Sequence, residues 1–139
     1  MNLRKKLIIP TILILSLLSL TAERITGQTV SAEVKNAFQT ANAAKLSNYF
    51  GHTLTLNIPG TDIQCSREEA KDKMTVFFNE HKINAFEIKF KGEKDNSNFL
   101  IGTLFTNKAT YRVNLFFRKS EGKNYIHLLR IDEEHESEF

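Results

Sequence analysis

Four side chains are the best candidates for acid–base chemistry or ligand binding: His127, Tyr111, Arg112 and Tyr49. An enzyme that moves protons needs a general base and a general acid that face its interior, with pKa values tuned by burial. Alternation places His127 on an apolar strand position, whereas the Asp and Glu side chains of the predicted helices and strands fall on outward positions. Because an inward acid–base pair is missing, the sequence favours a non-enzymatic binding module over an enzyme.

Each candidate also has a purely structural interpretation. His127 could be a half-buried, hydrogen-bonded histidine at the end of a sheet, and the tyrosines could pack in the core with their hydroxyls at its edge. Arg112 could hold an anionic ligand, or it could form a cross-strand ion pair with Asp132, worth under ~1 kcal/mol when exposed. The sequence leaves both kinds of role open.

The remaining reactive side chains predict neither a nucleophile nor a metal site. Cys65 precedes a predicted helix start, where a thiol can become nucleophilic, but the sequence places no histidine beside it. A single cysteine also excludes an intramolecular disulfide. The four histidines are scattered without the spacing of metal ligands. We therefore expect no metal and no cofactor.

Residues 1–27 have the pattern of a secretory signal peptide. Arg4, Lys5 and Lys6 precede an apolar run over residues 7–20, and polar residues follow directly. The run is shorter than the roughly 20 residues of a spanning helix, although an uncleaved anchor is the alternative. Cleavage after Ala22 or after Gly27 fits equally well. We expect an exported protein, periplasmic or extracellular, that meets the membrane only through this transient segment.

Removal of the signal peptide changes the charge of the chain. The full sequence carries a net charge of +3, but residues 1–27 hold four of its basic residues and one acidic residue, which leaves 15 of each sign. The mature chain is therefore near neutral. Because nucleic-acid binding needs a basic patch, we expect no nucleic-acid partner.

Residues 28–139 are predicted to form one domain with a core over about 30–132. Ser31 can cap a first helix, whose apolar residues are spaced by three and four: Val34, Ala37, Phe38 and Ala41. A short apolar turn over 46–50 is closed by Gly51. Ser66 and Glu69 form a capping box that starts a second long helix, which ends near residue 81.

Alternating apolar residues predict five strands, over 53–58, 85–91, 99–105, 109–118 and 125–132. In the second of these, Phe86, Ile88 and Phe90 are expected to point to one face. The strands are grouped after helices, and this order is typical of an α+β fold. We therefore predict helices packed on one face of a bent antiparallel sheet.

The hairpin around Asn107-Lys108 can be put in register by hand. A two-residue turn there sets Gly102 opposite Val113, and the resulting face is apolar or small throughout. The second face is not cleanly polar, because Arg112 is surrounded by Phe99, Ile101, Phe105 and Phe116. Something should cover that face: the C-terminal tail, a small apolar ligand, or a second copy of the chain in a homodimer.

The last hairpin allows two registers. A three-residue loop over 121–123 pairs Phe117 with His127 and places Arg112 opposite Asp132. A two-residue loop, Glu121-Gly122, shifts the pairing by one residue and turns His127 to the other face. The first register is preferred, because it keeps apolar residues in the core and gives Arg112 a counter-charge.

The order of these elements and several residue groups resemble a known family. The groups are Ala37-Phe38, Leu46-Ser47, Tyr49-Phe50, Ser66, Ala70, Phe77-Phe78, Gly102, Tyr111-Arg112-Val113 and Leu129-Arg130-Ile131. Residues 30–132 resemble the bacterial domain-of-unknown-function family 4783 of the nuclear transport factor 2-like (cystatin-like) superfamily. The resemblance implies a cone-like fold, a bent sheet wrapped on helices with a pocket at the open end. Superfamily members include isomerases, dehydratases and binding modules, so the alternative function is an isomerase-like or dehydratase-like enzyme that uses His127 and a tyrosine.

Overall fold

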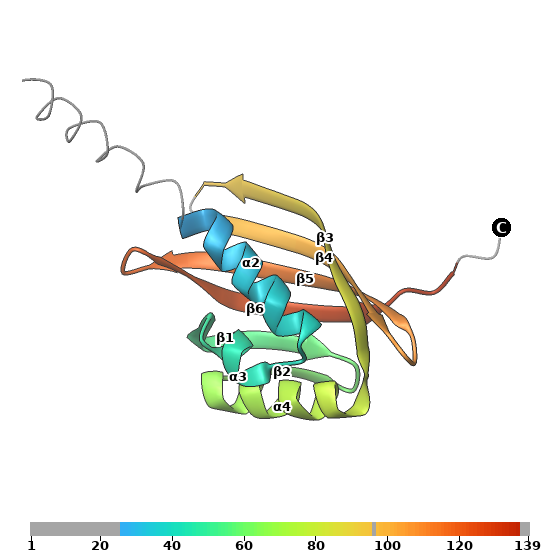
Figure 1. Ribbon diagram of the computed structural model, residues 1–139. Coiled ribbons are helices and arrows are strands. Elements are labelled where there is room, and N and C mark those ends of the chain that lie inside the picture. Colours follow the sequence, from blue (N-terminus) through green and yellow to red (C-terminus); the bar gives the residue numbers. More distant parts are fainter. Residues whose placement is uncertain (1–25, 96, 137–139) are drawn as a thin grey trace, which may run out of the picture. The chain divides into compact units, whose positions relative to one another are not determined.

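The computed structural model describes residues 26–95 and 97–136 (Figure 1). Nearly all of the predicted signal peptide, including its candidate cleavage site after Ala22, lies outside the described residues. From Ser31 onward the chain forms one compact unit, to which all packing described below belongs. The elements are α2 (Thr26–Gln39), α3 (Ala43–Ser47), β1 (Phe50–Ile58), β2 (Thr61–Ser66), α4 (Arg67–Glu80), β3 (Ile83–Lys94), β4 (Ser97–Thr106), β5 (Thr110–Ser120) and β6 (Lys123–Glu133).

The six strands form one sheet in the order β2-β1-β6-β5-β4-β3. Neighbouring strands are antiparallel except β1 and β6, which pair in parallel. Figure 1 shows α2 crossing one face of β3–β6, α4 beside β1 and β2, and β3 curving strongly away from the end of α4. The predicted α+β class is confirmed. The sheet is mixed and not wholly antiparallel as predicted, because the last strand, β6, runs parallel to β1 at its side.

The helices confirm one predicted cap, at Ser66, and correct two, at Ser31 and Gly51. Ser66 caps α4, because its hydroxyl accepts a hydrogen bond from the Glu69 N–H at 3.2 Å. Asn42 caps α3 in the same way. Ser31 lies inside α2 and is not its N-cap, since apolar spacing marks only the buried part of a helix. Gly51 belongs to β1, because α3 ends on Asn48 in an ordinary helical conformation and needs no glycine.

The edge strand β2 was not predicted. Its sequence, TDIQCS, offers only two apolar residues to the alternation, and Ile63 is half-buried while Cys65 is buried. It pairs with β1 through a tight turn at Pro59-Gly60, in which Gly60 has a φ of +79°. That positive φ favours glycine, so the predicted strand break is a hairpin turn.

Aromatic rings form the centre of the core between α2 and the sheet. Phe38 stacks on Phe86 with ring centroids 4.7 Å apart and meets the edge of Phe78 at 5.9 Å. The Phe86 ring lies directly over Gly102, where a Cβ atom would come within 2.6 Å of it. Gly102 therefore leaves room for the central ring of the core.

A β-bulge in β3 changes the face on which Phe90 lies. Ile88 pairs with Gly102, but Phe90 pairs with Ile101, so one extra residue, Lys89, is inserted between them. A bulge of this kind switches the following side chains to the opposite face. The prediction that Phe90 shares the core face with Phe86 is wrong, because alternation alone does not reveal an inserted residue.

The two C-terminal hairpins are resolved differently. In the first, Gly102 pairs with Val113 and Phe99 with Phe116, as predicted. In the second, Glu121 and Gly122 have φ values of 51° and 77° and form a two-residue loop, so the three-residue loop and the pairing of Phe117 with His127 are wrong.

A bulge at His127 reconciles the two registers of the last hairpin. Phe117 pairs with Ile126 on the turn side of the bulge, and Phe116 pairs with Leu128 beyond it. The predicted register, with Arg112 opposite Asp132, is therefore restored in the second half of β6. Among the residues described, no helix is long and apolar enough to cross a membrane.

Candidate functional site

The outer face of the sheet, which is the face of β3–β6 turned away from α2, carries an unusual group of apolar side chains. Phe90 is 67% exposed and Phe116 is 38% exposed, although both are large and apolar. Directly paired residues across the strands share a face. This aromatic band therefore consists of Phe90, Phe99, Ile101, Phe116 and Leu128.

Two features build the band into a continuous surface. The bulge at Lys89 brings Phe90 beside Ile101. The Phe99 ring lies over Gly92, where a Cβ atom would come within 2.3 Å of it, and its centroid is 6.5 Å from that of Phe116. Apolar side chains gathered on a water-facing surface often mark an interaction site.

Arg112 lies at one end of this band, and its ion-pair partner differs from the predicted one. Its Nε lies 3.5 Å from a carboxylate oxygen of Glu134, in the tail that follows β6. Asp132 is opposite Arg112 as predicted, but it bonds to Arg130 on its own strand at 2.6 Å. The predicted pair of Arg112 with Asp132 is therefore wrong, because Arg130 presents its guanidinium closer to that carboxylate.

The ion pair between Arg112 and Glu134 borders two hollows. The larger, of about 430 Å³, lies between β5 and the residues from Asp132 to His135. The smaller, of about 240 Å³ and here called the arginine hollow, lies on the outer face of β3, β4 and β5. Its walls include Phe90, Ile101, Thr103, Arg112, Asn114 and Glu134.

His127 is half-buried at the bulge of β6, between Ile126 in the core and Leu128 on the outer face. Burial lowers the pKa of its imidazole, and the positive charge of Arg118 lowers that pKa further. The neutral ring is therefore favoured near neutral pH.

Tyr111 is buried and bonded to a histidine that sequence reasoning had missed. Its hydroxyl lies 3.0 Å from Nε2 of His81, and Nδ1 of the same ring lies 2.8 Å from the Phe77 carbonyl oxygen. A carbonyl only accepts hydrogen bonds, so Nδ1 carries the proton and Nε2 accepts the bond from Tyr111. Burial and the charge of Glu133 raise the pKa of the Tyr111 phenol. The pair is internally satisfied and has a structural role.

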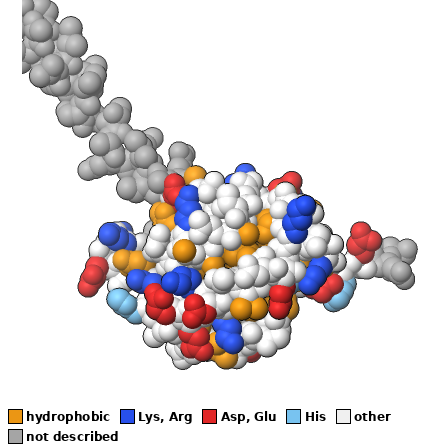
Figure 2. Space-filling model, turned by 60° about the horizontal axis from the view of Figure 1, so that its bottom comes forward, with side chains coloured by type: hydrophobic (Ala, Val, Ile, Leu, Met, Phe, Trp, Pro, Cys, Tyr) orange, Lys and Arg blue, Asp and Glu red, His pale blue; other side chains and the backbone are white. Residues whose placement is uncertain are grey.

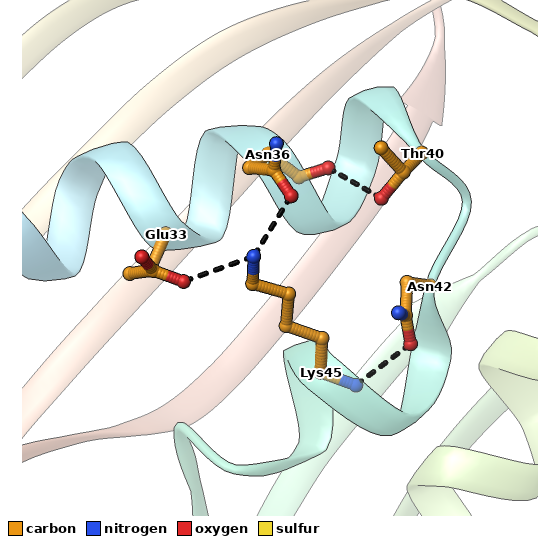
Figure 3. Close-up of polar contacts among 5 residues, drawn as sticks. All are labelled: Glu33, Asn36, Thr40, Asn42 and Lys45. Atoms are coloured by element: carbon orange, nitrogen blue, oxygen red, sulfur yellow. Dashed lines mark hydrogen bonds and ion pairs between the residues drawn. The ribbon is translucent and has the colours of Figure 1, made fainter.

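Tyr49 belongs to a polar junction between α2 and α3. Figure 3 shows Lys45 reaching from α3 to two residues of α2: its Nζ lies 3.0 Å from the Glu33 carboxylate and donates to the side-chain amide oxygen Oδ1 of Asn36 at 2.8 Å. Burial and the charge of Glu33 raise the pKa of the half-buried Tyr49 phenol, while Lys45 opposes that rise. Tyr49 therefore lies at a helix junction, on the other side of the sheet from the aromatic band.

The structure separates Tyr111 from His127. Tyr111 pairs with Glu133, and the Cα atoms of Glu133 and His127 are roughly 20 Å apart along β6, because a strand rises about 3.3 Å for each residue. Among the residues described, buried polar side chains are limited to Ser47, His81 and Thr103, and none is acidic. The backbone of Tyr49 lies beside Ile126, but among the residues described no hydrogen bond or ring contact joins the His127 side chain to a tyrosine, as the isomerase-like or dehydratase-like alternative requires.

Cys65 and the charged side chains of the described residues provide no further candidate site. Burial and the charge of Glu69 raise the pKa of the Cys65 thiol, which opposes a nucleophilic thiolate. Within residues 26–95 and 97–136, no three His, Cys, Asp or Glu side chains cluster as metal ligands. On the face seen in Figure 2, basic and acidic side chains are interspersed.

The bent sheet and the helices on one of its faces define an NTF2-like α+β domain. The chain belongs to the family described as "Domain of unknown function (DUF4783)", whose model matches residues 31–132. The predicted family and fold class are confirmed.

Solved structures support this assignment. The chain is 36% identical to a DUF4783 family protein from Bacteroides uniformis, over 76% of this chain and 97% of that one, with a TM-score of 0.72. It is 34% identical to a family member from Bacteroides ovatus, over 76% and 96% of the two chains, with a TM-score of 0.72. An NTF2-like protein of unknown function from Cytophaga hutchinsonii, 18% identical over 82% and 95%, with a TM-score of 0.57, shares the fold. A comparison with curated proteins gives no match.

Proposed function

We propose that this protein is a non-enzymatic binding module that docks a partner on the outer face of its sheet, and that the partner is a second copy of the chain. The observation that carries the proposal is the aromatic band, in which Phe90 and Phe116 are 67% and 38% exposed. Burying such side chains against a partner stabilises a complex by roughly 25 cal/mol for each Å² of apolar surface removed from water.

The edge strand β3 disfavours a partner that adds a strand to the sheet, and so favours a partner that docks on the face of the sheet. β3 is an edge strand, and it carries Lys89, Lys91 and Lys94 together with the bulge at Lys89. Lysines and bulges on an edge strand oppose pairing with another strand. A partner is therefore expected to stack on the aromatic band.

A second copy is the simplest occupant, because a two-fold axis lets the same patch serve on both subunits. Phe99, Phe116 and Leu128 lie in one row across three strands, where they can stack on the equivalent row of another molecule. A small apolar ligand on the same band is the competing occupant. It would leave the mass of the protein unchanged.

The non-enzymatic part of the proposal rests on the state of the inward polar groups. His81 and Tyr111 satisfy each other and the Phe77 carbonyl, and neither has a free polar atom to offer a substrate. His127 is half-buried at the bulge, and its side chain has no hydrogen bond or ring contact with Tyr111 or Tyr49, although the Tyr49 carbonyl accepts a hydrogen bond from the neighbouring Ile126 N–H at 2.7 Å. The proposed place of action is the periplasm or extracellular space, which N-terminal sequencing of the exported protein would test.

The experiment compares three variants by sedimentation velocity across the micromolar range. Wild-type protein is expected to sediment as a dimer, and Phe90→Ser and Phe116→Ser to sediment as monomers. Val76→Ser is the matched control, since Val76 is 52% exposed on α4, away from the outer face. A wild-type monomer at every concentration, or a Val76→Ser variant that dissociates as readily, would overturn the proposal.

A further inference from the structure

The arginine hollow combines three kinds of surface that an anionic ligand needs. Phe90 and Ile101 supply an apolar wall and floor, and Arg112 supplies a guanidinium at the rim. Thr103 and Asn114 line the same space from adjacent strands, where Thr103 pairs with Arg112 and Asn114 pairs with Ile101. The volume of about 240 Å³ is below the roughly 300–1,000 Å³ of pockets for drug-sized molecules, so a matching ligand is small.

Two polar side chains in the hollow have no partner within the described part of the protein. Neither the Thr103 hydroxyl nor the Asn114 amide is hydrogen-bonded to another described group. Thr103 is only 9% exposed. Every fully buried side-chain oxygen or nitrogen among the described residues has a hydrogen-bond partner, so the unpartnered Thr103 hydroxyl is not fully buried. Because Thr103 lines the hollow, its hydroxyl is open to that space. A nearly buried, unpartnered hydroxyl at the side of a cavity is a position prepared for a ligand.

The arginine is held by a contact that a ligand can replace. Its Nε meets Glu134 at 3.5 Å, and the side chains of both residues are substantially exposed. Such an ion pair is worth under ~1 kcal/mol. Glu134 is also tethered by its backbone, since its N–H donates to the Thr110 carbonyl at 2.8 Å. The tail therefore holds the Glu134 carboxylate beside Arg112, where the carboxylate of a ligand could take its place.

We propose that the arginine hollow binds a small organic monocarboxylate with an apolar tail. Its carboxylate takes the place of the Glu134 carboxylate on Arg112 and accepts hydrogen bonds from Thr103 and Asn114, while its tail packs on Phe90 and Ile101. Lys89 at the rim is neutralised by Glu87 at 2.6 Å. Arg112 is then the one cation of the hollow that a ligand can neutralise, and a single positive charge matches a monocarboxylate better than a dianionic phosphate.

The hollow shares Phe90 and Ile101 with the aromatic band, so ligand binding is separated from dimerisation by Phe116→Ser, a substitution in the band that lies outside the hollow. The probe is hexanoate, added to the full protein and to the Phe116→Ser variant while amide and side-chain NMR signals are recorded. Hexan-1-ol and hexylammonium are the matched controls for the carboxylate. Saturable shifts at Thr103, Arg112 and Asn114 are expected with hexanoate alone.

Variants distinguish binding at a specific site from nonspecific binding to apolar surface. Arg112→Gln is expected to weaken hexanoate binding about tenfold or more, as the loss of a charge-assisted hydrogen bond does. Glu134→Gln is expected to tighten binding several-fold, because it removes the competing carboxylate, and Arg130→Gln is expected to leave the Kd unchanged. Equal binding of hexan-1-ol, an unchanged Kd in Arg112→Gln, or weaker binding in Glu134→Gln would overturn the proposal, whatever the mass of the protein.

Discussion

The phenol of Tyr111 donates a hydrogen bond to Nε2 of His81 across 3.0 Å, and both side chains are buried. The other ring nitrogen of His81 bonds to the Phe77 carbonyl, and the Phe77 ring stacks on the imidazole at a centroid distance of 4.2 Å. This relationship ties the end of α4 to the start of β5. It makes His81 and Tyr111 structural residues of the core.

Tyr111→Phe is therefore expected to destabilise the protein. The change leaves Nε2 of His81 buried without a donor, and an unsatisfied buried polar atom costs about 1–3 kcal/mol. Urea denaturation gives the free energy of unfolding. Tyr125→Phe is the control, since the hydroxyl of the half-buried Tyr125 has no hydrogen bond to the described residues. Equal losses in the two variants would contradict the assigned hydrogen bond.

Gly102→Ala should cost more stability than Gly92→Ala, although both glycines lie under a phenylalanine ring. At Gly102 the new methyl group would meet the Phe86 ring at 2.6 Å and the Glu87 carbonyl oxygen at 2.9 Å, and Phe86 is fixed by its stacking on Phe38. Overpacking of this kind costs roughly 1–3 kcal/mol. At Gly92 the obstacle is the partly exposed end of Phe99, which can swing aside. Thermal melts in the reverse order would show that Phe86 is not held in place.

Glu121→Asn is expected to raise the melting temperature slightly. Glu121 and Gly122 both have positive φ in the two-residue turn between β5 and β6, and Asn adopts that conformation more readily than Glu. The gain should be under about 1 kcal/mol. Glu121→Gln removes the same charge without the conformational preference, so it should leave the melting temperature unchanged. A matching rise in Glu121→Gln would assign the effect to charge.

The lowered pKa of His127 makes stability depend on pH. The unfolded imidazole titrates near 6.5, whereas burial and Arg118 keep the folded ring neutral to lower pH. Between these two pKa values the unfolded state binds more protons. The contribution to stability is therefore complete above about pH 6.5 and is lost as the pH falls through the folded pKa.

Denaturation of wild-type protein and of His127→Gln between about pH 5 and about pH 7 tests this sign. The variant should show a flatter dependence of the free energy of unfolding on pH, and Arg118→Gln should move the NMR titration of His127 toward its ordinary value. His52→Gln, which replaces an exposed histidine, should keep the wild-type slope. Greater wild-type stability at the acid end of the range would reverse the assignment.

Strong local patterns made much of the fold predictable. The capping box at Ser66 and the apolar stripe behind it specify α4, and a two-residue turn at Asn107-Lys108 makes one face of the first hairpin apolar or small throughout, which sets its register. β2 escaped prediction because an exposed edge strand buries little and needs few apolar residues. Ser31 and Gly51 were misassigned because each occurs at helix ends and inside elements alike.

The site was harder to predict because it depends on insertions and long-range contacts. One-residue bulges at Lys89 and His127 decide which face carries Phe90 and the imidazole, and alternation does not record them. The role of His81 depends on Tyr111, thirty positions away, so its place at a helix end gave no sign of it. Excess apolar residues around Arg112 on the second face were the one sequence signal that located the outer face correctly.

The most direct measurement of the central claim is an isotope-filtered NOE experiment on a mixture of labelled and unlabelled protein, which detects contacts between two copies only. Docking through the aromatic band predicts intermolecular NOEs from the rings of Phe90 and Phe116 to the outer face of the other copy. Intermolecular NOEs confined to other surfaces, such as Val76 on α4, would contradict it. The complete absence of intermolecular NOEs at protein concentrations high enough to drive self-association would contradict it as well.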